Sequence, residues 1–185
     1  MRVEFYFDFS CPFAHVAQAQ IEELAARTGA ELVWCPMLLG GVMRALGSDQ
    51  VTAAESEAKK RHHVIDRLRW AELRGLPMAP VPHHPQKSVR ALRAVLAVPE
   101  ARRPGLIHAL FDAYWARGER LEDTATIARA LDLAGVTGAA AATALAANDD
   151  PAMKQELVRR TDEAIARGVF GAPTFLVTGP DGRER

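Results

Sequence analysis

The N-terminal part of the chain constrains the fold more than any other segment, because it describes a strand, a helix and a second strand in succession. Aromatic and β-branched residues alternate with polar ones over residues 3–9, which is typical of a strand. Apolar residues then recur at helical spacing from Pro12 until Gly29, and a second strand is expected over residues 31–37. A unit of this length predicts two parallel strands joined by a right-handed crossover.

The remainder of the chain is mostly helical and closes on a short strand. Each expected helix is bounded by a proline, a glycine, or an acidic or threonine cap. Asp150 precedes Pro151 at the start of the last helix, where the helix dipole favours an acidic group. A loop with four prolines is expected over residues 76–85. The helices are expected near residues 52–74, 86–98, 103–117, 123–133, 137–147 and 151–167, and the strand over residues 174–178.

Composition excludes several classes of protein. The 185 residues include 23 basic and 23 acidic side chains, and this balance argues against a nucleic-acid partner. A hydrophobic fraction of 49% excludes a largely disordered chain. No apolar run approaches the roughly 18 residues needed to cross a bilayer, so no membrane partner is expected. Two cysteines are too few for a disulfide scaffold and the N-terminus lacks a signal-peptide pattern, so a cytoplasmic location is expected.

Cys11 is the first candidate for chemistry. It lies between the first strand and the first helix, where it is expected to be the N-cap, with Pro12 at the first helical position. Unpaired N–H groups and the positive end of the helix dipole stabilise an anion there, so a lowered thiol pKa is expected. The structural alternative is that Cys11 is a small buried apolar residue, as most cysteines are.

The second candidate is the segment over residues 171–175, in which Pro173 opens the last strand. A proline cannot donate to a sheet, so this position permits either a strand edge or a cis peptide bond. A cis bond would turn the backbone N–H and C=O of Ala172 outward, where they could pair with a peptide-like ligand. A trans proline before an edge strand is the alternative.

Other reactive residues have competing structural explanations. Cys35 lies near the end of the second strand, where it either approaches Cys11 closely enough for a disulfide or packs in the core. His15 stands one turn into the first helix and could approach Cys11. His83 and His84 lie in the proline-rich loop without the spacing of a known metal motif, so no metal site is expected.

Four groups of residues carry a resemblance to a known family. They are residues 5–14 (FYFDFSCPFA), residues 36–42 (PMLLGGV), Lys59 and Asp66 with residues 69–71 (RWA) and 75–77 (GLP), and residues 164–175 (AIARGVFGAPTF). Together they resemble the glutathione-dependent branch of the DsbA-type thioredoxin superfamily, which contains 2-hydroxychromene-2-carboxylate isomerase and the kappa-class glutathione transferases. The resemblance covers nearly the whole chain.

The resemblance implies an α/β fold in which a large all-helical subdomain is inserted into a thioredoxin-like sheet. Residues 1–40 would form the N-terminal βαβ part, residues 41–147 the helical subdomain, and residues 148–185 the C-terminal part of the sheet domain. The turn over residues 179–182 calls for a partner strand, and the family pattern continues beyond it. A C-terminal hairpin strand and a terminal helix are therefore expected to be missing from this chain.

The resemblance also assigns binding residues, and the chain departs from the family pattern at several positions, including Ser48, where the family often has asparagine, and His62, where it often has tyrosine. Glutathione would bind beside Cys11, with Ser48 and the Ala172–Pro173 bend contacting it. Isomerases of this branch usually carry serine where this chain has Cys11, and that hydroxyl hydrogen-bonds the glutathione sulfur. Disulfide oxidoreductases of the superfamily carry Cys-x-x-Cys, whereas this chain has Ala14 at the second position.

Three charged residues are candidates for binding the substrate. The resemblance places Lys59 and Asp66 on a helix over the active-site cleft, although both could be ordinary surface charges. Lys87 opens a helix after the proline-rich loop and could meet a substrate carboxylate.

The resulting hypothesis is a glutathione-dependent isomerase of 2-hydroxychromene-2-carboxylate or of a related small aromatic enone acid. Two alternatives stay open at this point. One is a DsbA-like monothiol thiol-disulfide oxidoreductase in which Cys11 forms a mixed disulfide, and the other is a glutathione- or peptide-binding module without turnover. Similar proteins tend to be dimers, so a homodimer is expected.

Overall fold

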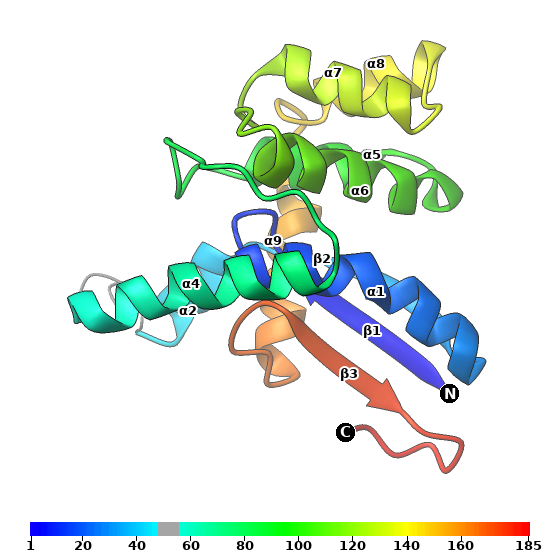
Figure 1. The fold of residues 1–185 in the computed structure, drawn as a ribbon. Helices are drawn as coiled ribbons and strands as arrows, with labels where there is room; N and C mark the ends of the chain where they lie inside the picture. The colour runs from blue at the N-terminus through cyan, green and yellow to red at the C-terminus, as the bar shows by residue number, and fades with distance from the viewer. Residues whose placement is uncertain (48–55) are drawn as a thin grey trace.

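The N-terminal strand–helix–strand unit is present in the computed structural model, which describes residues 1–47 and 56–185 (Figure 1). Strand β1 (Arg2–Phe7) pairs in parallel with β2 (Glu31–Pro36), and helix α1 (Pro12–Thr28) joins them. Helix α1 ends at Gly29, whose positive φ of 64° is the left-handed conformation that terminates many helices. The predicted unit is therefore confirmed, except that β1 stops at Phe7 and does not extend to residue 9.

The sheet has three strands in the order β2-β1-β3. Strand β3 (Thr174–Thr178) runs antiparallel to β1, with Thr174 opposite Tyr6. Beyond the turn that follows β3, the amide and carbonyl groups of Val177 and Arg185 exchange hydrogen bonds of 2.8 and 2.9 Å. Because β1 is central, β2 ends and β3 begins beside the turn that leaves β1, and this brings residues from the two ends of the chain together.

The segment between β2 and β3 is helical, as expected, and its boundaries follow the predicted ones closely. Helix α2 was not expected, and the predicted helix over residues 103–117 is divided into an α-helix and a short π-helical turn. The start of the helix predicted from residue 52 lies outside the described residues. The elements are α2 (Leu39–Ala45), α4 (Glu57–Leu73), α5 (Val89–Ala97), a 3-10 turn (Glu100–Arg102), α6 (Arg103–Phe111), the π-helical turn (Asp112–Ala116), α7 (Thr124–Leu133), α8 (Gly138–Ala146) and α9 (Pro151–Ala166).

Side chains alternate between two cores on the faces of the sheet. Phe5 and Phe7 of β1 point into the larger core, which also contains Trp34 and residues of α1 and of the helices α5 to α8. Tyr6 and Cys35 point to the opposite face, where they pack with residues of α9. In Figure 1 the helices α5 to α8 form a block beyond the C-terminal ends of β1 and β2, and α4 crosses near the start of β3.

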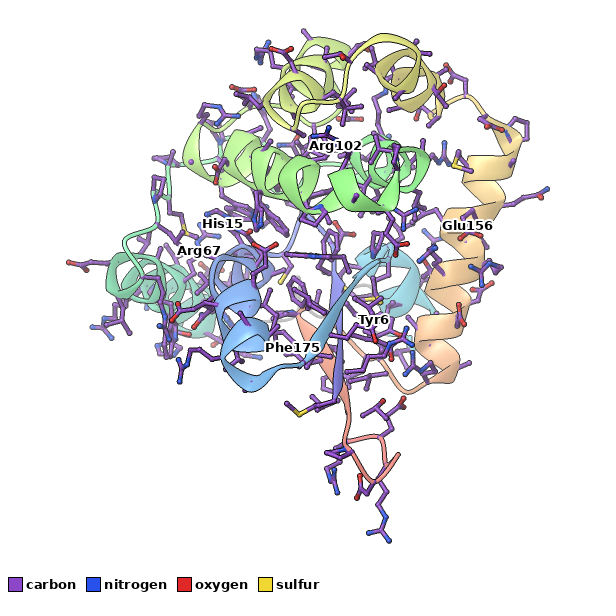
Figure 2. All side chains as sticks on the ribbon, turned by 90° about the vertical axis from the view of Figure 1, so that its right-hand side faces the viewer. Tyr6, His15, Arg67, Arg102, Glu156 and Phe175 are labelled. Atoms are coloured by element: carbon purple, nitrogen blue, oxygen red, sulfur yellow. The ribbon has the colours of Figure 1, made fainter. Side chains whose placement is uncertain are left out.

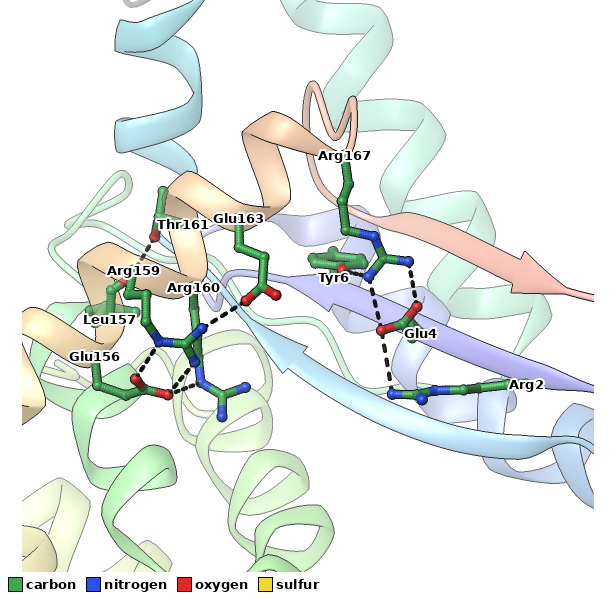
Figure 3. Close-up of polar contacts among 10 residues, drawn as sticks. All are labelled: Arg2, Glu4, Tyr6, Glu156, Leu157, Arg159, Arg160, Thr161, Glu163 and Arg167. Carbon is green, nitrogen blue, oxygen red and sulfur yellow. Dashed lines mark hydrogen bonds and ion pairs between the residues drawn. The ribbon is translucent and has the colours of Figure 1, made fainter. Parts of the chain in front are cut away.

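Arg167, which caps α9, fastens that helix to the sheet (Figure 3). Its guanidinium donates hydrogen bonds of 2.9 and 2.6 Å to the two carboxylate oxygens of Glu4, and one of 2.6 Å to the Tyr6 hydroxyl. The hydrogen bonds from Arg167 lower the pKa of Glu4 against the opposing effect of burial. This bidentate pair fixes the smaller core beneath β1.

No described helix is both long and apolar enough to cross a lipid bilayer. The division of the chain at residues 40 and 147 stays a prediction.

Trp115 provides a stability test of how the helical block is attached to the end of β1. Its ring is fully buried, and its indole N–H donates a hydrogen bond of 2.9 Å to the carbonyl of Phe9. Trp115→Phe leaves that buried carbonyl without a partner, so the free energy of unfolding should fall by about 2 kcal/mol in urea denaturation.

The matched control is Trp70→Phe, because Trp70 lies on α4 with 44% of its surface exposed. This variant should stay within about 0.5 kcal/mol of the wild type. Equal unfolding free energies for the two variants would contradict the role assigned to the indole hydrogen bond.

Candidate active site around Cys11

A buried carboxylate shapes the turn that carries Cys11. Asp8 follows β1 and is 1% exposed. One of its carboxylate oxygens accepts hydrogen bonds from the Ser10 amide and hydroxyl at 2.9 and 3.0 Å, and the other accepts from the Leu39 amide at 2.8 Å. Burial raises the pKa of Asp8, although these donors act in the opposite direction. Asp8 therefore ends the strand and joins the Cys11 turn to the start of α2.

The sequence analysis overlooked Asp8, and a local signal for it exists. An aspartate two residues before a serine at the end of a strand is the pattern of an Asx turn, in which the side chain accepts from the amide two residues on. The same pairing explains why β1 is shorter than predicted, since Asp8 directs its backbone away from the sheet.

Cys11 occupies the predicted position at the start of α1. It is the N-cap in extended conformation, with φ of −91° and ψ of 116°, and Pro12 begins the helix. Its carbonyl accepts the His15 amide at 3.3 Å, and its own amide donates to the Asp8 carbonyl at 3.1 Å. Both backbone groups of Cys11 are thus fixed, and only the thiol is available to other partners.

The thiol meets the second segment that the sequence analysis identified. The Ala172–Pro173 peptide bond is cis, which is one of the two alternatives that the sequence left open. The Cys11 Sγ lies 2.9 Å from the carbonyl oxygen of Ala172, although the two residues are 161 positions apart in the chain. The Ala172 amide has no hydrogen-bond acceptor among residues 1–47 and 56–185. Among the described residues, only the Cys11 thiol engages the Ala172 carbonyl, and the adjacent N–H is unpaired. This arrangement suits the amide of a peptide-like ligand.

The expected lowering of the Cys11 pKa is wrong. Burial raises the pKa of this thiol to about 11, because only 6% of the residue is exposed and a thiolate loses its hydration there. The amides of Ala14 and Phe13 favour the thiolate, but less strongly, and the carboxylate of Asp8 adds to the increase. At neutral pH Cys11 is a neutral thiol and a hydrogen-bond donor.

Among the described residues, no side chain of the other predicted site residues forms a hydrogen bond with Cys11, although the backbone amide of His15 donates to the Cys11 carbonyl. His15 is fully buried with its ring 5.8 Å from that of Phe111, and neither of its nitrogens has a hydrogen-bond partner in the described part of the chain. Lys59 and Asp66 lie on α4, which packs against α1, and Lys87 is exposed just before α5. Ser48 lies outside the described residues.

Cys35 is separated from Cys11 by the sheet itself. It pairs in register with Tyr6 and packs on the α9 face, whereas Cys11 belongs to the larger core on the other face. Both thiols are free, so the disulfide considered above is absent. Burial also raises the pKa of Cys35, to about 12.

The fold and the site together define a protein of the thioredoxin type, in which a residue at the first helix N-terminus faces a cis-proline bend. The chain matches the DSBA-like thioredoxin domain over residues 2–184, and it belongs to that family. The α/β fold and the superfamily predicted from the sequence are thereby confirmed.

Relatives of known name support an enzyme of this family. The chain is 26% identical over 177 residues to 2-hydroxychromene-2-carboxylate isomerase of Pseudomonas putida, covering 96% of this chain and 85% of that protein. It is 22% identical over 192 residues to glutathione S-transferase kappa 1 of Caenorhabditis elegans, covering 99% and 83% of the two chains. A solved structure of a 2-hydroxychromene-2-carboxylate isomerase superposes with a TM-score of 0.82 at 25% identity, covering 96% and 85%.

The raised pKa of Cys11 predicts how its alkylation depends on pH. In a Cys35→Ser variant, which isolates Cys11, the rate of reaction with iodoacetamide should be low at neutral pH. It should rise about tenfold per pH unit until close to pH 11, because only the thiolate reacts. The pKa of Cys11 in the folded protein is higher than the value of about 8.5 expected in the unfolded chain. The neutral thiol therefore stabilises the fold fully below about pH 8.5, and this contribution is lost as the pH rises towards 11. A rate that levels off below about pH 8 would contradict the assignment of a neutral thiol.

Proposed function

We propose that this protein is a glutathione-dependent isomerase that interconverts 2-hydroxychromene-2-carboxylate and trans-o-hydroxybenzylidenepyruvate, or acts on a related aromatic enone acid. The observation that carries the proposal is the 2.9 Å contact between the Cys11 sulfur and the Ala172 carbonyl. This contact joins a thiol donor to a backbone segment with an unpaired amide. The curated isomerase relatives support the choice of reaction.

The residues around Cys11 fit glutathione as a peptide-like thiol. The unpaired N–H and the carbonyl of Ala172 match the backbone of its cysteinyl residue in the manner of a strand added to a sheet edge. When bound, glutathione supplies a thiolate that adds reversibly to a conjugated double bond, so that the bond can rotate before the thiolate leaves.

Cys11 acts in this scheme as a donor. Its thiol turns from the Ala172 carbonyl to the ligand's sulfur, and the carbonyl then accepts the ligand's amide in exchange. A hydrogen bond to a sulfur anion favours the ionised form and so lowers the pKa of that thiol. Cys11 keeps its proton throughout, which agrees with the increase of its pKa to about 11.

The same properties make a redox role the weaker alternative. A thiol that must attack a disulfide needs thiolate character and access, and Cys11 has a raised pKa and is 6% exposed. Ala14 leaves the motif without a second thiol to resolve a mixed disulfide. The proposed isomerase reaction requires neither a thiolate at Cys11 nor a second thiol in the motif.

Several finer expectations stay predictions. Ser48 as a glutathione contact, and Lys59, Asp66, Lys87 and His15 as substrate residues, remain to be tested by substitution. The homodimer and the cytoplasmic location likewise stay predictions.

The test follows ring opening of the chromene by ultraviolet absorbance, with and without glutathione, in the wild type and in three variants. Cys11→Ala should lower kcat/KM by about 10- to 100-fold, because a hydrogen bond to a charged group is lost. Cys11→Ser should stay within several-fold of the wild type, since a hydroxyl also donates. Cys35→Ala is the matched control on the opposite face of the sheet and should leave the rate unchanged.

The proposal would be excluded if the rate of ring opening did not depend on glutathione. It would also be excluded if Cys11→Ala opened the ring as fast as the wild type. Loss of activity in Cys11→Ser equal to that in Cys11→Ala would identify the sulfur as a nucleophile. Glutaredoxin-type reduction in place of isomerisation would favour the monothiol oxidoreductase. Calorimetric binding of glutathione without turnover of any enone or disulfide would favour the binding module.

A further inference from the structure

Arg67 is a half-buried cation for which the described residues provide no counter-ion. It lies on α4, a helix that packs against α1 (Figure 2), and its guanidinium carbon stands 5.6 Å from the centre of the Trp115 ring. Its Nε is shielded from solvent and has no hydrogen-bond partner, and no carboxylate pairs with Arg67 among the residues that the structure describes. The residue as a whole is half-buried, so part of its guanidinium is still accessible.

A second donor stands over the same indole. The ring centre of His84 lies 5.1 Å from that of Trp115, and its Nδ1 is 2.8 Å from the Tyr114 hydroxyl. That hydroxyl already accepts the Gln86 amide at 3.3 Å, so its proton is available to His84 Nδ1. The proton of the neutral imidazole is then on Nε2, for which the described residues provide no acceptor.

The charges around His84 agree with this assignment. Burial lowers the pKa of His84, and the positive charge of Arg67 lowers it further. Burial also lowers the pKa of Arg67 and raises that of Tyr114. A neutral imidazole beside an unpaired guanidinium therefore leaves a net positive charge that a ligand could compensate.

Trp115 connects these two donors to the candidate active site. Its indole N–H binds the carbonyl of Phe9, two residues before Cys11, while its ring contacts both Arg67 and His84. The donors thus lie on the helical side of the Cys11 turn, whereas Ala172 lies at the end of the sheet.

We propose that Arg67 and His84 form a carboxylate-binding subsite, which receives the acid group of the enone substrate and sets the preference of the enzyme for anionic substrates. The proposal rests on the isomerase function for the identity of that substrate. A planar guanidinium binds a carboxylate through paired hydrogen bonds, and the imidazole Nε2–H supplies a further donor. Glutathione also has carboxylates, but its backbone is assigned to Ala172 on the sheet side.

The test measures binding directly and does not depend on turnover. Titration calorimetry compares trans-cinnamate, its neutral amide and S-methylglutathione as probes of the wild type and of Arg67→Gln. Loss of Arg67 should weaken cinnamate binding by about tenfold or more, and should leave the binding of the amide and of S-methylglutathione unchanged.

Two further variants complete the design. Arg61→Gln removes an exposed arginine from the same helix and should bind all three probes as the wild type does. Arg67→Met keeps the hydrocarbon stem that packs near Trp115, so it carries the test if Arg67→Gln does not fold by circular dichroism. It should show the same loss for cinnamate.

Unchanged cinnamate binding in the folded Arg67 variant would overturn the subsite, as would a loss confined to S-methylglutathione. A wild type that binds cinnamate no better than the amide would overturn it as well. Failure of the proposed isomerase function is a separate result. If the wild type does not open the chromene ring but Arg67→Gln still binds cinnamate more weakly than the wild type, the proposed reaction is wrong and the subsite is supported. If Arg67→Gln isomerises the chromene with the wild-type KM and binds cinnamate as the wild type does, the subsite is wrong and the isomerase function is unaffected.

Discussion

The contact between the Cys11 thiol and the Ala172 carbonyl is the interaction on which the functional interpretation depends. It exists because β1 is the central strand, so the turn after β1 and the bend before β3 meet at one edge of the sheet. Asp8 holds the first of these segments through the Ser10 and Leu39 amides, and Trp115 holds it from the helical side through Phe9. The site is therefore fixed by buried polar contacts from three parts of the chain.

The protonation of Cys11 shows how two physical effects compete at a helix N-terminus. The amides of Phe13 and Ala14 favour a thiolate, and burial opposes it more strongly. The outcome is a thiol that donates hydrogen bonds at neutral pH. In the proposed function, a donor at this position takes the role of a serine hydroxyl, so the cysteine does not by itself imply redox chemistry. In the proposed subsite, Arg67, for which the described residues provide no counter-ion, adds a charge that suits an acidic substrate.

Local sequence was sufficient for the βαβ unit and for the N-cap position of Cys11, because each depends on neighbouring residues only. At Pro173 it narrowed the choice to a cis bond or a strand edge, and the structure shows the cis bond. Helix α2 was missed because Gly40 and Gly41 argue against a helix, yet a Cβ on Gly41 would lie 3.1 Å from the Thr161 side chain, and this explains the glycine there. The direction of the Cys11 pKa depends on burial, which is a tertiary property. The cluster of Arg67, His84 and Trp115 likewise arises only when α4, a loop and the π-helical turn pack together.

The most direct test of the central claim is a difference ultraviolet titration of thiolate formation when glutathione binds. The account predicts that a thiolate with a pKa clearly below the usual value of about 8.5 appears only in the complex, and that Cys11→Ala raises this pKa towards that of free glutathione. A low-pKa thiolate that is present without glutathione would show that Cys11 itself ionises. A depressed pKa that persists in Cys11→Ala would show that Cys11 does not stabilise the bound sulfur, and either result would contradict the account.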